Sequence, residues 1–278
     1  MKSSVKSQIR ILMEKKITIF MFLAMIAIVL INYFQNVNAY ANTAINFMMN
    51  PMRLLLLSAD AYEAGSLKFI FLQFYPFLVI LPAGFSYALD KNSKMEIYLK
   101  GRLGGKNYFL GKIIAAFIVT FIIFTIPFLI EMGLNCIAFP LNANGNASYE
   151  GVYSTSYLAS VEGYLFFGAF KISSYLYSLI TILIFGFSSG ILAVFTMATS
   201  IFLSKYKVLM LLPTYLLLYG LGMLYTILPN TTIHTSYFDY FSMFDISNKN
   251  QVIFLTVLIL LLVSSILCIM RSARKDTF

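Results

Sequence analysis

The sequence predicts an all-α polytopic membrane protein, and its composition, its apolar runs and its charge distribution support that prediction. Of the 278 residues, 60% are hydrophobic and only 11% are charged, whereas a soluble domain carries about 25% charged residues. Six stretches each supply the roughly 20 apolar residues that a helix needs to cross a bilayer. These predicted spans are approximately 17–38, 67–89, 112–135, 174–203, 208–228 and 251–270, within a single transmembrane domain over 1–278.

The basic residues predict how the spans are oriented. Cytoplasmic loops of membrane proteins carry an excess of Lys and Arg. If the N-terminus is cytoplasmic, 16 of the 20 lysines and arginines fall on the inner side, in 1–16, 90–112, 204–207 and 271–278. We therefore expect a multi-pass protein of the cell membrane, embedded in the lipid bilayer with both termini in the cytoplasm. The net charge of +9 then reflects this topology, and nucleic acid is not expected as a partner.

Residues 1–16 have the spacing of an amphipathic helix. Val5, Ile9, Leu12 and Met13 share one helical face, and the basic side chains occupy another. A helix of that kind lies along the inner surface of the membrane. The alternative is a solvated basic segment whose positive charge only fixes the orientation of the first span.

Residues 100–112, KGRLGGKNYFLGK, combine glycine and lysine in a way that suggests a phosphate-binding loop. A Walker-type loop needs a glycine five residues before its Gly-Lys pair, because its backbone amides and the lysine surround the phosphates. Lys100 stands at that position before Gly105, and Lys106 stands there before Gly111, so both candidates fail. We therefore expect no catalytic residues and no cofactor bound by this chain.

The loop between the second and third predicted spans is instead expected to contain a short docking helix. Apolar side chains recur at helical spacing from residue 95 to residue 103, with charged side chains around them, as on a surface that binds a soluble partner. Gly104 and Gly105 would end this helix and turn the chain into the third span. The candidate docking residues are Met95, Glu96, Tyr98, Leu99, Arg102 and Leu103. An ordinary positively charged cytoplasmic loop is the alternative.

Polar side chains inside predicted spans are costly to bury and therefore indicate function. We assign four of them to a substrate path: Asn32, Gln35, Gln73 and Glu131. The position of Glu131 near the outer end of its span favours a side chain that reaches the membrane interface. One histidine and two cysteines, near opposite membrane faces, do not predict a metal site.

Two loops are too apolar to lie free in water. The aromatic residues 229–250 predict a re-entrant segment between the fifth and sixth spans, which is tolerated where it packs against protein. Residues 51–62 read PMRLLLLSADAY and predict an interfacial helix. Small residues permit close packing of membrane helices, and we expect this of Gly186, Gly190, Gly220 and Gly222.

Six predicted spans, an amphipathic N-terminal segment and a charged loop between spans two and three together resemble the type-2 family of ABC export permeases. In that family the loop carries a coupling helix, and a Tyr-x-x-Gly-Lys sequence leads into span three. This chain has Tyr108-Phe109-Leu110-Gly111-Lys112 at that position. The Glu-x-x-x-Gly-Thr pattern that commonly precedes the coupling helix is absent, and DKNSKMEIYLKG stands in its place.

The resemblance covers the whole chain as a layout and implies the membrane subunit of an ATP-driven exporter. A separate ABC ATPase subunit would bind ATP and Mg²⁺ and dock on residues 95–103, and a second permease chain, identical or related, would complete a dimer. The implied substrate is amphipathic or hydrophobic, such as an antimicrobial peptide handled by bacteriocin or lantibiotic immunity systems. The alternatives are an ion-coupled carrier or channel, and an ABC-type signalling subunit that does not transport.

Overall fold

The computed structural model describes residues 2–58, 64–142, 161–203, 208–227, 235–245 and 249–275, and the regular structure of these residues is helical apart from one isolated β-bridge. Within these residues, four helices are long and apolar enough to cross a membrane. They are α2 (Lys16–Ala39), α6 (Gly105–Ala138), α9 (Ser174–Ser200) and α12 (Gln251–Lys275). These four coincide with the first, third, fourth and sixth predicted spans.

The other two predicted spans contain shorter apolar helices. In the second, α3 (Ala64–Leu78) is followed by a turn and then by α4 (Ser86–Asn92), so the predicted continuous helix is wrong. Pro82 lies in that turn. It has no backbone N–H to donate to a helical hydrogen bond, and its ring disfavours the helical backbone conformation of the residue before it. In the fifth, η3 (Val208–Met210) precedes α10 (Leu212–Ile227). The six-span layout therefore remains a prediction for these two stretches.

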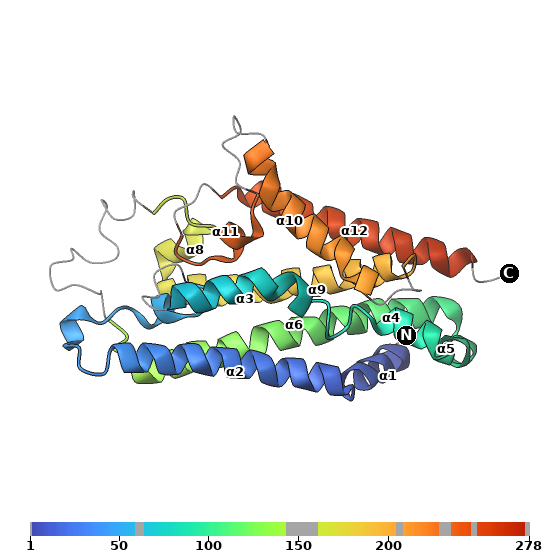
Figure 1. Cartoon of the computed structure of the whole chain (residues 1–278), viewed down its shortest axis with the longest axis horizontal. Helices are drawn as coiled ribbons and strands as arrows, with labels where there is room; N and C mark the ends of the chain where they lie inside the picture. The colour runs from blue at the N-terminus through green and yellow to red at the C-terminus, as the bar shows by residue number, and fades with distance from the viewer. Residues whose placement is uncertain are drawn as a thin grey trace.

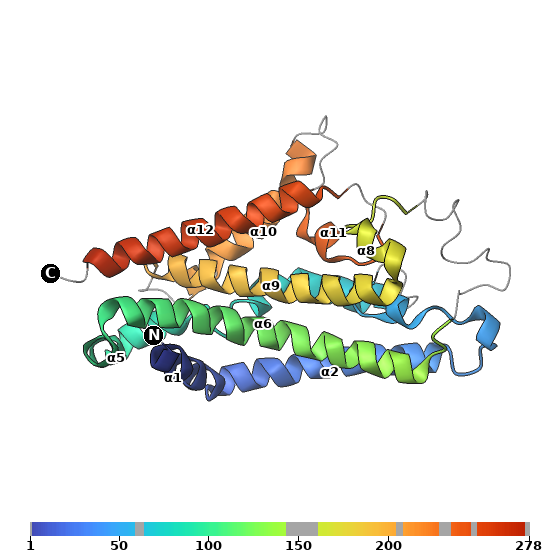
Figure 2. The same ribbon diagram turned by 180° about the vertical axis from the view of Figure 1, so that it is seen from behind.

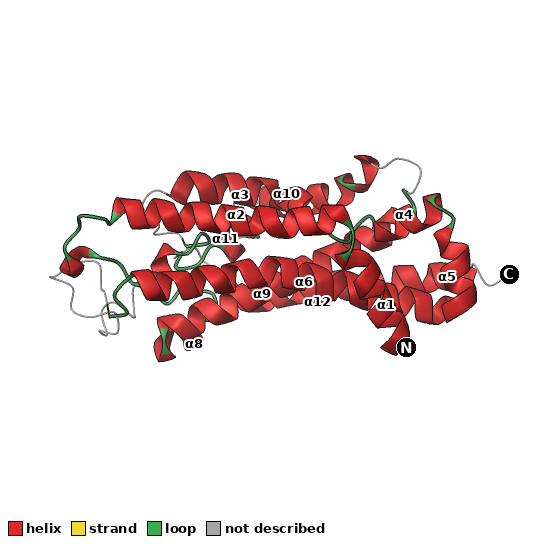
Figure 3. Cartoon of the chain, turned by 90° about the horizontal axis from the view of Figure 1, so that it is seen from below, coloured by secondary structure: helices red, strands yellow, loops and turns green. Residues whose placement is uncertain are grey.

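The elements form an elongated bundle around α6 (Figures 1 and 2). Helix α6 packs against α9, α2 and α12, and also against the N-terminal helix α1 (Lys2–Met13). One end of the bundle holds α1, α4, α5 (Met95–Leu103) and the last turns of α12 (Figures 1 and 3). The other end holds η1 (Ile45–Phe47) and α8 (Phe167–Ile172), while α10 and α12 slant away from the remaining helices (Figure 1).

The centre of the bundle is filled by aromatic side chains. The ring centroid of Phe185 on α9 lies 5.1 Å from that of Tyr75 on α3 and 5.4 Å from that of Phe128 on α6. It also lies 5.0 Å from that of Phe241 on α11 (Tyr237–Phe241). Aromatic pairs at such distances add to the stabilisation from burial alone. Four elements that are distant in sequence therefore share one core.

Two of the four predicted packing glycines lie where α6 and α9 approach closely. A Cβ atom on Gly186 would lie 1.9 Å from Thr125 Oγ1, and one on Gly190 would lie 2.7 Å from the ring of Phe117. An alanine at either position would therefore force neighbouring atoms to shift. At Gly220 a Cβ atom would meet no described atom within 4 Å, and at Gly222 it would meet its first neighbour at 4.0 Å. Among the described residues, the prediction of close packing is therefore wrong for that pair.

Helix α5 and helix α6 are separated by one residue, Gly104, whose φ of 78° and ψ of 140° only glycine adopts without strain. The predicted end of the helix at this glycine is confirmed.

We expect Gly104→Ala to destabilise this corner by about 1–3 kcal/mol, since alanine would hold a strained backbone there. The measurement is the rate of trypsin cleavage after Arg102, which should rise because local opening exposes that bond. Gly101→Ala is the matched control: Gly101 lies inside α5 with open space around its Cα, so alanine should slow cleavage. Equal rates in wild type and Gly104→Ala would contradict the assigned strain.

Candidate functional site

A buried ion pair joins α4 to α6. The Oδ2 atom of Asp90 accepts a hydrogen bond from the hydroxyl of Tyr108 at 2.9 Å and pairs with the Nζ atom of Lys112. The side chains of Lys112 and Asp90 are only 1% and 7% exposed. Buried charges are tolerated when they are paired in this way. We call Asp90, Tyr108 and Lys112 the junction cluster.

A third charge lies near the junction cluster, at the turn between α1 and α2. Burial lowers the pKa of Lys15, and the nearby Asp90 carboxylate opposes that shift. Asp90 therefore interacts electrostatically with a lysine from the N-terminal segment as well as with Lys112.

The inner face of α5 is attached to the same region. Glu96 Oε1 accepts a hydrogen bond from the hydroxyl of Tyr87 at 3.2 Å and pairs with Lys100 Nζ at 2.6 Å. The same Nζ atom lies 4.8 Å from the ring centroid of Phe109 on α6. Leu99 packs against the hydrophobic core from this side. Helix α5 is thus held to α4 and α6 by polar and apolar contacts together.

Helix α1 packs tightly on the start of α6 through small and polar residues. Ser4 Oγ donates a hydrogen bond to the carbonyl oxygen of Asn107 at 2.8 Å. A Cβ atom on Gly111 would lie only 2.5 Å from Ser4 Oγ. Gln8 and Leu12, 0% and 1% exposed, complete this face. The helix at residues 2–13 is as predicted, but the predicted apolar face is only partly correct. The packed face also includes Ser4 and Gln8, and it excludes Met13, which is 41% exposed.

These contacts explain the Tyr-x-x-Gly-Lys sequence. Tyr108, Gly111 and Lys112 are spaced i, i+3 and i+4, which brings them to one side of a helix. Tyr108 and Lys112 bind Asp90, and Gly111 admits Ser4 of α1. Asp90 is the residue that sequence reasoning missed, because it was one of several charges on a basic loop.

The outer face of α5 is exposed. The exposed fractions are 50% for Met95, 69% for Ile97 and 80% for Tyr98, and Arg102 is exposed beside them. Sequence reasoning missed Ile97, and it placed Leu99 on the docking edge although this side chain faces inward.

The remaining two candidate docking residues also have little outward surface. Glu96, with a side chain 12% exposed, makes the inward contacts described above, and Leu103 is half-buried. The exposed side chains of α5, and hence its candidate docking face, are therefore Met95, Ile97, Tyr98 and Arg102.

A second group of buried polar side chains, which we call the Glu131 cluster, consists of Asn32, Asn36, Glu131 and Asn135. Asn32 Nδ2 donates to Glu131 Oε1 at 2.5 Å and to the carbonyl oxygen of Leu54 at 3.0 Å. Asn36 Nδ2 donates to the same carbonyl oxygen at 2.7 Å. All four side chains are at most 3% exposed. The prediction that Glu131 reaches the membrane interface is wrong, because this side chain is 0% exposed.

The Glu131 cluster holds an irregular backbone segment inside the bundle. The backbone N–H of Leu56 donates to Glu131 Oε1 at 2.8 Å, and Asn135 Nδ2 donates to the carbonyl oxygen of Pro51 at 3.3 Å. Buried backbone groups outside regular structure need such partners. The predicted interfacial helix at 51–62 is wrong over its described part, since η2 (Pro51–Leu54) is followed by buried, non-helical residues up to Ser58. Residues 59–63 lie outside the described residues.

The structure brings together two of the four predicted substrate-path residues. Asn32 and Glu131 are 99 positions apart and hydrogen-bonded. Gln35 is exposed on α2, and Gln73 is half-buried on α3. Neither belongs to the cluster.

Residues 235–245, which make up most of the described part of the predicted re-entrant segment, pack into the bundle and contact the 51–58 segment. Met243 N–H donates to the carbonyl oxygen of Leu57 at 2.7 Å, next to the parallel bridge between Ser58 and Met243. Tyr237, Tyr240 and Phe241 are buried. The rest of 229–250, at 229–234 and 246–248, lies outside the described residues.

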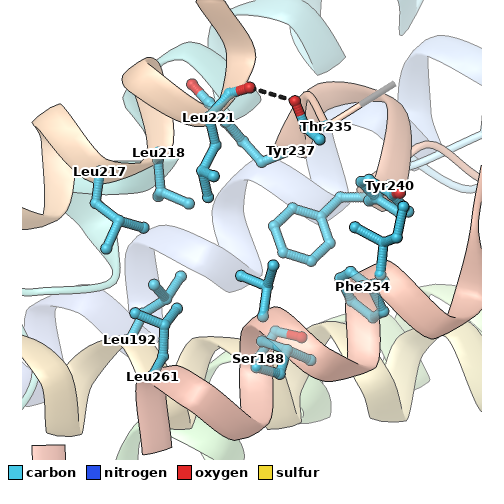
Figure 4. A pocket seen from close by; sticks show the side chains of 14 residues that line it. Ser188, Leu192, Leu217, Leu218, Leu221, Thr235, Tyr237, Tyr240, Phe254 and Leu261 are labelled. Atoms are coloured by element: carbon cyan, nitrogen blue, oxygen red, sulfur yellow. Dashed lines mark hydrogen bonds between the residues drawn. The ribbon is translucent and has the colours of Figure 1, made fainter. Parts of the chain in front are cut away.

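An apolar pocket of about 60 Å³ lies between α9, α10, α11 and α12 (Figure 4). Leu192, Leu218 and Phe254 help to line it, and Ser188 Oγ is a buried polar atom at its wall that has no hydrogen-bond partner among the described residues. An engineered protein cavity of about 150 Å³ binds benzene, and this pocket has less than half that volume. The pocket is therefore too small for a peptide or a ring-shaped substrate in this conformation.

No protein-family model, curated protein or solved structure matches this chain. Within the described residues, no group of three or more His, Cys, Asp or Glu side chains is placed to hold a metal ion. The sole histidine, His234, lies outside the described residues. Among the described residues, the junction cluster with α5 and the Glu131 cluster are two places where buried polar side chains gather around a charged group.

Proposed function

We propose that this chain is the membrane permease subunit of an ATP-driven ABC-type exporter, and that a separate ATPase docks on α5. The observation that carries the proposal is the division of α5 into two faces. Its outer face exposes Ile97 and Tyr98, and its inner face is bound to α4 and α6 through Glu96 and Lys100. A force applied to the outer face would pass directly into α6.

The exposed side chains suit a protein partner. Tyr and Arg are enriched among residues that dominate binding energy at interfaces, and α5 exposes Tyr98 beside Arg102. Exposed apolar side chains in a cluster indicate a surface that binds another molecule. The buried charges behind α5 keep this surface in a fixed orientation, which lowers the ordering cost of docking.

The rest of the proposed complex follows from the predicted topology. The chain crosses the cell membrane six times with α1 and α5 in the cytoplasm, and residues 229–250 re-enter the membrane from the outside. A second permease chain, identical or related, completes the translocation path, and the partner ATPases bind ATP and Mg²⁺. The substrate is amphipathic or hydrophobic, for which an antimicrobial peptide is the leading candidate.

We expect Tyr98→Glu to reduce the amount of ABC ATPase that co-purifies with the chain from native membranes by about tenfold or more, since it places a charge at the centre of the docking face. The measurement is quantitative mass spectrometry of the purified complex. Ile172→Glu is the matched control, because Ile172 is 73% exposed and belongs to α8, which lies at the other end of the bundle (Figure 1). Unchanged recovery of the ATPase with Tyr98→Glu would remove α5 as the docking site.

An ion-coupled carrier is the second candidate, and the fully buried Glu131 is the observation that favours it. Carboxyl groups among membrane helices commonly mark proton or ion pathways. The two candidates differ in their energy source. Transport into vesicles that stops without ATP and persists without an ion gradient supports the exporter, and the reverse result supports the carrier.

A further inference from the structure

The Glu131 cluster has more hydrogen-bond acceptors than donors. The Nδ2 groups of Asn32, Asn36 and Asn135 donate to Glu131 and to backbone carbonyl oxygens. Three buried oxygen atoms then accept no hydrogen bond from any described residue: Glu131 Oε2, Asn32 Oδ1 and Asn135 Oδ1. An acceptor cannot satisfy another acceptor, and each such buried atom carries a desolvation cost.

Within the part of the chain that the structure describes, no ion pair compensates the charge of the cluster either. Two basic side chains lie on the segments nearest to it, and each has its own partner: Arg53 lies 5.6 Å from the ring centroid of Phe244, and Lys68 Nζ donates to the carbonyl oxygen of Ser58 at 3.3 Å. Helix α9 carries no charged residue, and the only one on α2, Lys16, lies at its opposite end from Asn32. Helix α12 carries its charged side chains in its last two turns. An ionised Glu131 would be a buried charge with no opposite charge bound to it among the described residues, and this would destabilise the folded protein.

One proton removes the charge and satisfies two of the three oxygen atoms, Glu131 Oε2 and Asn32 Oδ1. It neutralises Glu131 and turns Oε2 from an acceptor into a donor. Asn32 already donates to Oε1 of the same carboxyl group, so the two side chains are in contact, and Asn32 Oδ1 and Glu131 Oε2 both lack a donor. An acid and a primary amide facing each other can exchange two hydrogen bonds, one in each direction.

We propose that the Glu131 cluster is a proton-binding site: Glu131 carries a proton in the folded protein, and its Oε2–H group donates to Asn32 Oδ1. Loss of the proton leaves a buried negative charge and two more orphaned acceptors beside the 51–58 segment. That segment is held by Glu131 through Leu56 N–H, and it holds Met243 through Leu57. The bound proton therefore controls how firmly two segments are held. This site is independent of whether an ATPase docks on α5.

The test uses Glu131→Gln, because a glutamine has the shape of the protonated acid and donates to Asn32 Oδ1 permanently. We expect the melting temperature of the wild-type protein in nanodiscs to fall from about pH 6 to about pH 9, since a proton bound only by the folded state is lost as the pH rises. Glu131→Gln should match the wild type near pH 6 and lose this dependence. Glu162→Gln is the matched control, because Glu162 is exposed, and it should keep the wild-type profile.

A second measurement does not depend on a variant that folds. The infrared spectrum of the wild type near neutral pH should contain the C=O stretching band of a protonated carboxyl group, since exposed carboxyl groups are ionised there. Absence of the band overturns the proposal, as does a Glu131→Gln protein less stable than the wild type at every pH. If added Na⁺, but not K⁺, restores wild-type stability near pH 9, the site binds a metal cation instead of a proton.

Discussion

Replacing Asp90 by alanine is expected to lower the free energy of unfolding by about 3–5 kcal/mol, because it leaves the ammonium group of Lys112 buried without its partner. The hydroxyl of Tyr108 also loses its acceptor. The measurement is the melting temperature of the purified protein in nanodiscs, where a loss of this size corresponds to a drop on the order of 10 °C.

Two variants define the origin of this loss. Asp90→Leu combined with Lys112→Met removes both charges and keeps an apolar side chain at each position, so it should recover most of the stability. Glu14→Ala breaks an ion pair with Arg10 in which both side chains are exposed, Arg10 by 81% and Glu14 by 63%. This variant should have no measurable effect on the melting temperature. An Asp90→Ala protein as stable as Glu14→Ala would show that the buried pair contributes nothing.

Replacing Gly186 by alanine is expected to lower the free energy of unfolding by about 1–3 kcal/mol through overpacking between α6 and α9. The new Cβ atom would lie 1.9 Å from Thr125 Oγ1 and 3.3 Å from the backbone oxygen of Phe121. A β-branched side chain such as threonine has little freedom to move aside. The same melting experiment measures the loss.

The chain offers both a control and a rescue for this change. Gly220→Ala adds the same methyl group where no described atom lies within 4 Å, and it should raise stability by about 0.5–1 kcal/mol. Thr125→Ala removes the atom that clashes, and that Oγ1 atom has no hydrogen-bond partner among the described residues. The double variant Thr125→Ala with Gly186→Ala should therefore be more stable than Gly186→Ala alone. No rescue would place the strain elsewhere.

The features that the sequence predicts correctly are local ones. Apolar length is sufficient to predict α2, α6, α9 and α12, since crossing a bilayer requires about 20 apolar residues. Helical spacing and one glycine predict α5 and its end at Gly104.

The features that it does not predict depend on which helices are neighbours. The contact between Asn32 and Glu131 joins positions 99 residues apart. The 51–58 segment has the composition of a helix, but its buried backbone is held by asparagine and glutamate side chains that belong to other elements. The sequence nevertheless contains a signal for this cluster. Two apolar runs each carry a polar pair at i, i+4, namely Asn32 with Asn36 and Glu131 with Asn135. The two members of each pair therefore lie on one face of their helix.

The length of α6 has a mechanical consequence for the two polar clusters. Lys112 and Glu131 are on the same helix, 19 positions and thus roughly 28 Å apart. If α6 pivots at Lys112 by about 5°, simple leverage over this distance displaces Glu131 by about 2.5 Å. The hydrogen bond from Leu56 N–H to Glu131 is 2.8 Å long, and a displacement of about 2.5 Å would break it. A rotation of only about 5° is therefore enough. Pro127 lies inside α6 one turn before Glu131, and a proline inside a helix removes a backbone hydrogen bond and makes bending easier at that point.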